Sequence, residues 1–186
     1  MFKDIMVDLE TMATGSNASI VQFGAVEFDR NTGLTGRRFK HNVSLESCIV
    51  AGLRVDGNTV EWWMTKPDNQ RLNLYDPKPF LLGVVLVKFN EWLMDSPAGS
   101  ANLHLWGRSP RFDIAILADA YKAMNLLVIW NFRNEMCVRT IEALEPGIKA
   151  VMDVQNSNAN SHDVIDDCLH QIGYCSAIWQ TIKKPF

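Results

Sequence analysis

The sequence predicts an α/β fold in which a mixed β-sheet is flanked by helices. Segments with strand composition follow one another directly near the start of the chain, and strand-like and helix-like segments alternate after them. Strands joined by short turns pair antiparallel, whereas strands separated by a helix pair parallel, so the pattern indicates a central mixed sheet of five strands. The length of 186 residues suits one domain, and no internal repeat or low-complexity linker divides residues 1–186.

The first three strands are expected at residues 5–9, 19–29 and 37–45. Val, Ile and Phe, which favour pleated and partly buried positions, are concentrated in the second of these segments. The turn sequence RNTG separates the second strand from the third. Because the connections are short, we expect these strands to form an antiparallel meander.

Helices are expected between the third and fourth strands. A short helix at residues 57–67 ends at Pro67, which cannot continue a helical hydrogen-bond ladder. A longer helix is expected at residues 79–94. Its apolar residues recur close to a helical period and are Leu82, Val85, Leu86, Phe89 and Leu93.

The second half of the chain alternates between strand-like and helical patterns. Ile114, Leu117 and Tyr121 recur at helical spacing between the strand-like runs NLHLWG and LLVIWN. The stretch QNSNANS has the composition of a polar loop. We therefore expect strands at 102–107 and 126–131, helices at 111–125, 136–144 and 162–182, and a loop at 155–161.

Composition favours a soluble cytoplasmic protein. The net charge of −3 and the pI of about 5.8 argue against a broadly basic nucleic-acid-binding surface and against a polybasic membrane anchor. No apolar segment is long and uninterrupted enough to span a bilayer. The four cysteines lack CxxC spacing and are interpreted as reduced thiols. A phosphate-bearing substrate would need local cations, such as a metal or the pairs Arg108 and Arg111 or Arg37 and Arg38.

The stretch KDIMVDLETMATG raises the first chemical question. Successive strand residues point to opposite faces, so Asp8 and Glu10 share one face while Leu9 points to the other. Two neighbouring carboxylates raise one another's pKa unless a cation lies between them. A metal site is one interpretation, and a solvated sheet edge is the other.

Two later stretches also contain acids that admit structural explanations. Asp113 lies in the first turn of an expected helix, where the helix dipole favours an acid. In SHDVIDDCLHQI, a regular helix aligns His162 with Asp166 at i,i+4, whereas Asp167 would point about 140° away from His162 at 3.6 residues per turn. His162 could approach Asp167 only if the histidine lies outside the helix.

Together, DLET, RFD and HDVIDD resemble the three exonuclease motifs of the DEDDh family, which includes proofreading exonucleases and ribonuclease T. The similarity extends through the whole chain. QFGAVEFD is similar to the family's second strand, and TVEWWMTKPDNQRL with LWGRSPRFD is similar to a compact exoribonuclease-like branch found in phages and bacteria. The resemblance implies a ribonuclease H-like fold and 3′-to-5′ exonuclease activity.

The resemblance also implies a role for five residues. Asp8 and Glu10 match the acids of the first motif, Asp113 the acid of the second, and Asp167 the final acid. His162, five positions before Asp167, matches the family's general base on a mobile loop. The family pattern therefore selects Asp167 over Asp166.

The chemistry of phosphodiester hydrolysis suits these groups. Two divalent ions roughly 3.5–4 Å apart can stabilise both the attacking and the leaving oxygen. Oxygen ligands favour Mg²⁺ or Mn²⁺, and the lack of a Cys/His cluster argues against zinc. We expect Asp8 to bridge the two ions, Glu10 and Asp167 to complete one site, and Asp113 to act at the other.

The expected partner is the 3′ end of single-stranded RNA or DNA. By the resemblance, Leu9, Thr11 and Met12 lie near the sugar and base of the terminal nucleotide, although relatives commonly carry a small or hydroxyl residue near Met12. Aromatic side chains can stack on unpaired bases. The candidates for this role are Trp62, Trp63 and Phe112, and the Trp pair could equally belong to the core.

Two alternatives from other functional classes remain open at this level. One is a catalytically idle module that binds nucleic acid or serves replication, and the other is an enzyme that trims very short oligonucleotides. The sequence does not separate RNA from DNA, because contacts to the 2′-hydroxyl have no simple signature. The family contains monomers and dimers, so a homodimer also remains open.

Overall fold

The computed structural model describes residues 2–109, 111–155 and 162–183. Their strands form one mixed sheet in the order β3-β2-β1-β4-β5. The β1/β2 and β2/β3 pairs are antiparallel, and the β1/β4 and β4/β5 pairs are parallel. The strands are β1 (Asp4–Thr11), β2 (Ile20–Phe28), β3 (Thr35–Asn42), β4 (His104–Gly107) and β5 (Glu135–Cys137). The predicted five-stranded mixed sheet is therefore confirmed.

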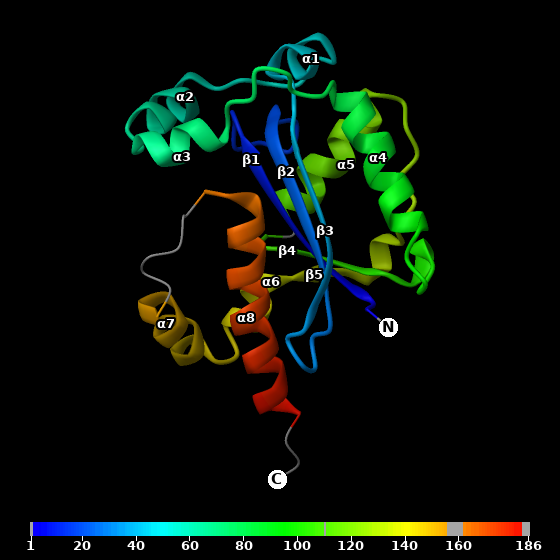
Figure 1. Cartoon of the computed structure of the whole chain (residues 1–186), viewed down its shortest axis with the longest axis vertical. Helices are drawn as coiled ribbons and strands as arrows, with labels where there is room; N and C mark the ends of the chain where they lie inside the picture. The colour runs from blue at the N-terminus through cyan, green and yellow to red at the C-terminus, as the bar shows by residue number, and fades with distance from the viewer. Residues whose placement is uncertain (1, 110, 156–161, 184–186) are drawn as a thin grey trace.

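Helices cover both faces of this sheet (Figure 1). The side of α4 and α5 shares a core with Ile5 and Val7 of β1, and the side of α8 shares a second core with Met6. The helices are α1 (Leu45–Val50), α2 (Gly57–Met64), α3 (Asp68–Asn73), α4 (Leu82–Met94), α5 (Asp113–Ala123), α6 (Val138–Glu142), α7 (Pro146–Gln155) and α8 (Val164–Ile182).

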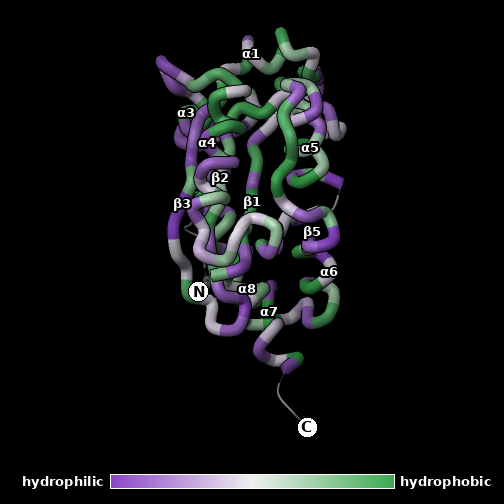
Figure 2. Tube along the Cα trace, turned by 90° about the vertical axis from the view of Figure 1, so that its right-hand side faces the viewer, coloured by the Kyte–Doolittle hydropathy of each residue, from purple (hydrophilic) through white to green (hydrophobic). Residues whose placement is uncertain are grey.

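The central strands are hydrophobic, and the outer strand is not. Every residue of β2 is buried, whereas in β3 only Phe39 is buried and the other residues are partly or fully exposed. Figure 2 shows this contrast, with hydrophobic segments along β1 and hydrophilic ones along β3 at the margin of the sheet. Among the described residues no helix is long and apolar enough to cross a membrane. The four cysteines form no disulfide.

One predicted strand is wrong. Residues 126–131 form no strand, and the fifth strand is β5, which begins at Glu135. Leu127 is 83% exposed, whereas Trp130 packs into the core and donates a hydrogen bond from Nε1 to Glu135 Oε1 at 3.0 Å. The apolar run thus anchors a connection through one side chain, a role that composition does not distinguish from strand pairing.

Several helix boundaries also differ from expectation. The helix expected at 79–94 begins at Leu82, and the helix expected at 136–144 is limited to Val138–Glu142, because the two residues before it belong to β5. Short helices α1, α3 and α7 were not expected. The loop expected at 155–161 lies outside the described residues except for residue 155, which ends α7.

A close backbone approach fixes the start of α8 on the sheet. Gly24 of β2 pairs with Asp8 of β1, and Val164 lies directly over it. A Cβ at Gly24 would lie 2.6 Å from Cβ of Val164. The side chain of Gln22 adds a second link, since its Oε1 accepts a hydrogen bond from the backbone N–H of Val164 at 3.3 Å.

Gly24→Ala should destabilise the fold by about 1–3 kcal/mol, because the added methyl group overpacks the contact with Val164. Urea denaturation would measure the change. Gly57→Ala is the matched control, since a Cβ there meets no atom within 4 Å, and it should cause no loss of stability. An unchanged urea midpoint for Gly24→Ala would show that the contact is not required.

Candidate active site

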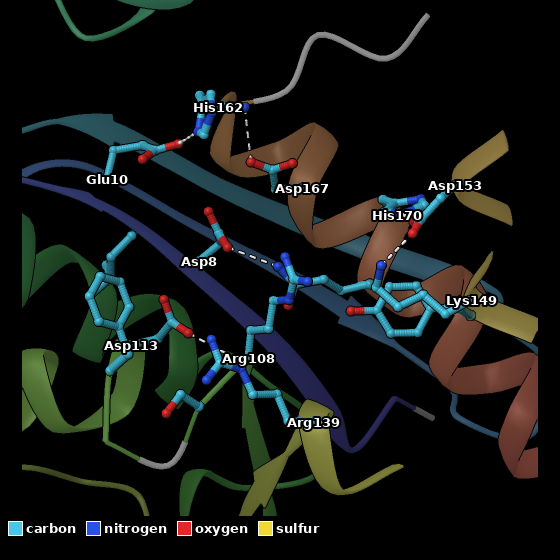
Figure 3. A pocket seen from close by; sticks show the side chains of 15 residues that line it. Asp8, Glu10, Arg108, Asp113, Arg139, Lys149, Asp153, His162, Asp167 and His170 are labelled. Carbon is cyan, nitrogen blue, oxygen red and sulfur yellow. Dashed lines mark hydrogen bonds and ion pairs between the residues drawn. The ribbon is translucent and has the colours of Figure 1, made fainter. Parts of the chain in front are cut away.

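The two acids of β1 face α8. Residues alternate along the strand, so Ile5, Val7 and Leu9 belong to the core on one face while Asp8 and Glu10 point to the other. Figure 3 shows both carboxylates at a pocket. The pocket has a volume of about 400 Å³ and lies between the sheet and α8.

Asp113 enters the same pocket from the start of α5. It is buried, and its Oδ2 accepts a hydrogen bond from the backbone N–H of Arg108 at 2.9 Å. Gly107 ends β4 and permits the close approach, because a Cβ there would lie 3.2 Å from Asp113 Oδ2. The turn between β4 and α5 therefore orients the carboxylate of Asp113.

Asp167 and His162 come from the start of α8. Asp163 caps the helix by accepting a hydrogen bond from the N–H of Ile165 at 3.0 Å, and His162 precedes the cap with a left-handed φ of 67°. The backbone N–H of His162 donates to Asp167 Oδ2 at 3.1 Å. The helical repeat does not apply to a residue outside the helix, so the i,i+4 alignment of His162 with Asp166 does not occur. Asp167 lines the pocket, and Asp166 does not.

The ring of His162 lies between an acid and two aromatic side chains. Nδ1 is 3.5 Å from Glu10 Oε1, and the ring centroid is 5.3 Å from those of Trp62 and Trp63. Trp63 is itself fixed by a hydrogen bond from Nε1 to the carbonyl oxygen of Thr11 at 3.0 Å. These contacts hold the imidazole at the carboxylates.

Burial and mutual repulsion raise the pKa of three carboxylates in the pocket. Burial raises the pKa of Asp8 well above its usual value, and the charges of Asp113, Asp167 and Glu10 raise it further. Burial likewise raises the pKa of Asp113 to about 7. Burial followed by repulsion from Glu10 raises the pKa of Asp167 to about 6. A cation bound between these carboxylates would lower the raised pKa values again.

Gln171 supports this cluster and was missed by the sequence analysis. Its Nε2 donates to Asp8 Oδ1 at 2.9 Å, and this bond opposes the rise in the pKa of Asp8. Gln171 follows Asp167 by four residues, so both side chains project from the same face of α8. That spacing could have identified Gln171, but only once Asp167 had been chosen.

A second hollow of about 460 Å³ adjoins the first and shares Leu9, Glu10, Phe112 and His162 with it. It contains the predicted substrate-contacting residues Thr11, Trp62 and Trp63 as well. Trp63 is buried, whereas Trp62 is 43% exposed, so only one member of the pair belongs to the core. We call this hollow the aromatic pocket.

Met12 does not join these residues. It lines a separate apolar hollow with Val60, Met64 and Tyr75. The next residue after Met12, Ala13, does line the aromatic pocket. Leu9, Thr11 and Ala13 therefore line the aromatic pocket, and Met12 does not.

The donor set suits a divalent cation. Among the described residues, Glu10, His162 and Asp167 form a group whose potential ligand atoms lie within 4.8 Å of one another. Asp8 and Asp113 add two carboxylates to the same pocket. Carboxylate oxygens are the ligands that Mg²⁺ and Mn²⁺ prefer.

Residues 3–179 match the family model described as the 3′-5′ exoribonuclease Rv2179c-like domain. The chain belongs to this family. Its membership confirms the DEDDh-type exonuclease resemblance and the predicted enzyme class, a 3′-5′ exonuclease. A curated protein, the exodeoxyribonuclease of Enterobacteria phage T4, is 26% identical over 200 residues, covering 91% of this chain and 86% of the phage protein.

Solved structures share the fold. Cell-death related nuclease 4 matches with a TM-score of 0.66 and 16% identity, covering 97% of this chain and 64% of that one. Exonuclease I of E. coli in complex with a dT13 oligonucleotide matches with a TM-score of 0.65 and 15% identity, covering 94% and 40%. This chain spans less than two thirds of either protein. At these identities the likeness shows the ribonuclease H-like fold alone.

Without divalent ions, the stability of the protein should fall as the pH rises from about 4 to about 8. The pKa values of Asp113, about 7, and Asp167, about 6, exceed the value near 4 of an unfolded chain. The folded state therefore binds extra protons in this range, and their contribution is complete below pH 4 and lost as the pH rises through 6 and 7. Urea midpoints measured in EDTA at pH 5 and pH 8 would give the difference.

Asp113→Asn should reduce this pH dependence, because it removes one buried acid. Asp95→Asn, at an exposed position after α4, should leave the dependence unchanged. A wild-type midpoint that rises between pH 5 and pH 8, or an Asp113→Asn profile identical to that of the wild type, would contradict the expectation.

Proposed function

We propose that the protein is a divalent-metal-dependent exonuclease that hydrolyses single-stranded RNA or DNA from the 3′ end. The observation that carries the proposal is the convergence of Asp8, Glu10, Asp113 and Asp167, from three distant parts of the chain, around one pocket that also contains His162. Family membership supports the direction of cleavage. The metals, the base and the single-stranded substrate are the parts that need testing.

We assign the binding of two Mg²⁺ or Mn²⁺ ions to the four carboxylates. Asp8 lies between Glu10 and Asp167 on one side and Asp113 on the other, which suits a bridging position (Figure 3). When bound, such ions stabilise charge on the phosphoryl oxygens and make water a better nucleophile. Gln171 keeps one oxygen of Asp8 engaged and so orients the other oxygen of that carboxylate.

His162 is assigned as the general base. A base must reach the attacking water and accept its proton, a role that histidine fills more often than any other side chain. Glu10 lies on the Nδ1 side of the ring, so Nε2 is the nitrogen assigned to accept the proton. Trp62 and Trp63 limit rotation of the ring by contact on its other sides.

The aromatic pocket is assigned to the 3′-terminal nucleoside. Exposed Trp62 and partly exposed Phe112 offer surfaces on which an unpaired base can stack. The structurally similar Exonuclease I of E. coli has been solved in complex with dT13 and dA16 oligonucleotides, which supports a single strand as substrate. The family is described as an exoribonuclease domain and the phage T4 relative is named an exodeoxyribonuclease, so both RNA and DNA belong in the assay.

The direct test incubates 5′-end-labelled single-stranded RNA and DNA with the protein and Mg²⁺ or Mn²⁺. A ladder that shortens from the 3′ end is the expected result, and EDTA should abolish it. Cleavage of dinucleotides alone would indicate an oligonucleotide-trimming enzyme. Binding without any product at saturating metal would contradict the proposal in favour of a catalytically idle module.

His162→Ala should lower kcat by about 10²–10⁴-fold without unfolding the protein, because the variant lacks a proton acceptor at the carboxylates. Cleavage rates at saturating metal from pH 6 to 9 would measure the effect. His41→Ala is the control, since His41 lies on β3 outside both pockets and its loss should leave the rate unchanged. Wild-type rates for His162→Ala across this range would remove His162 from the mechanism.

A further inference from the structure

Three basic side chains line the carboxylate-containing pocket at the end away from Glu10 and His162 (Figure 3). Arg108 follows β4, Arg139 belongs to α6, and Lys149 belongs to α7. We call these three residues the basic wall. The sequence analysis singled out Arg108 as a potential phosphate contact, whereas Arg139 and Lys149 were missed.

The acidic residues near the basic wall do not engage all of its N–H donors. Arg108 Nη2 and Lys149 Nζ lie 3.8 and 3.7 Å from Glu142 Oε1, which is too long for strong hydrogen bonds. Lys149 also contacts Asp153 closely. Arg139 is exposed and forms no ion pair within the described part of the chain. Guanidinium groups with free N–H donors therefore face the pocket in a protein of net charge −3.

The wall also contributes little that the fold requires. Arg139 is exposed, and the long ion pair of the half-exposed Arg108 side chain with Glu142 adds little stability. Lys149 is better packed, with Nζ 5.8 Å from the ring centroid of Tyr174. A structural role thus explains Lys149 in part and leaves the two arginines without one.

The position of the wall relative to the carboxylates defines which phosphate it can bind. The aromatic pocket lies at Glu10 and His162, and the basic wall lies at the opposite end of the adjoining pocket, with Asp8 between them. With the terminal nucleoside in the aromatic pocket and the scissile phosphate at the carboxylates, the strand continues toward the wall. Arginine binds phosphate through paired N–H donors, so the arginines of the basic wall suit a phosphate of the continuing strand.

The atoms exchanged in hydrolysis lead to the same phosphate. The oxygen of water bonds to phosphorus, the bond from phosphorus to the 3′ oxygen of the penultimate nucleotide breaks, and that oxygen takes up a proton. The terminal nucleotide departs with the scissile phosphate. The penultimate nucleotide keeps its own 5′ phosphate, which is the next charge along the strand.

We propose that Arg108, Arg139 and Lys149 form a second phosphate subsite, which binds the 5′ phosphate of the penultimate nucleotide. This inference rests on the proposed exonuclease function and adds a second phosphate contact to it. In a dinucleotide the same phosphate is the terminal 5′ group. The subsite therefore makes a 5′-phosphorylated dinucleotide a better ligand than its unphosphorylated counterpart.

The test compares pApA with ApA, using the sugar that the labelled-strand assay favours. Equilibrium dissociation constants are measured by calorimetry with Ca²⁺ in place of Mg²⁺, and cleavage is followed in parallel with Mg²⁺. The wild type should bind pApA at least about tenfold more tightly, as expected for hydrogen bonds to a charged group. Arg139→Ala should bring this ratio near one, and Arg139→Lys should give an intermediate ratio, because lysine keeps the charge without the paired donors.

Arg133→Ala is the matched control. Arg133 is exposed, stacks on Phe132, and lies outside the pocket, so its loss should leave the ratio unchanged. Equal affinities of the wild type for the two dinucleotides, or an unchanged ratio in Arg139→Ala, would overturn the subsite. A preserved affinity ratio without cleavage of either dinucleotide or of a longer strand would instead overturn the proposed function and leave the subsite in place.

Discussion

The alternation of side chains along β1 is the constraint on which the rest of the site depends. One central strand supplies apolar residues to the core of α4 and α5 and carboxylates to the face of α8. A shift of register by one residue would exchange these sets and bury both acids in an apolar core. Pairing of β1 with β2 on one edge and β4 on the other makes such a shift incompatible with the sheet.

The same geometry brings several carboxylates together at a partly buried site, where solvent screens their mutual repulsion weakly. Asp8 and Asp113 line the pocket, and the basic side chains of Arg108, Arg139 and Lys149 lie along its far end rather than between the acids. The apolar packing on both faces of the sheet offsets the resulting repulsion. The carboxylates that favour cation binding therefore lower the stability of the ion-free fold, and an ion that binds only the folded form would raise that stability.

Sequence periodicity predicted the features that rest on local pattern. The antiparallel meander, the long amphipathic helices and the shared face of Asp8 and Glu10 all follow from residue spacing. The failures have non-local causes. LLVIWN resembles a strand, but its Trp130 anchors a connection, and β5 is only three residues long. Asp167 could not be separated from Asp166 by helical geometry, because the left-handed residue before α8 breaks the repeat. Gln171, Arg139 and Lys149 carry no motif and become visible only when α6, α7 and α8 are assembled around the pocket.

The docking of α8 has a further consequence for how function relates to folding. Its first turn carries Asp167 and follows closely on His162. Contacts of Val164 with Gly24 and Gln22 and the ion pair of Asp163 with Lys40 attach this turn to the sheet. Fraying of that turn would withdraw two of the five groups while both cores remained intact. Local opening at one helix end, at a free-energy cost far below that of global unfolding, is thus sufficient to disassemble the site. Catalytic competence in this architecture is a property of a single helix terminus as much as of the whole domain.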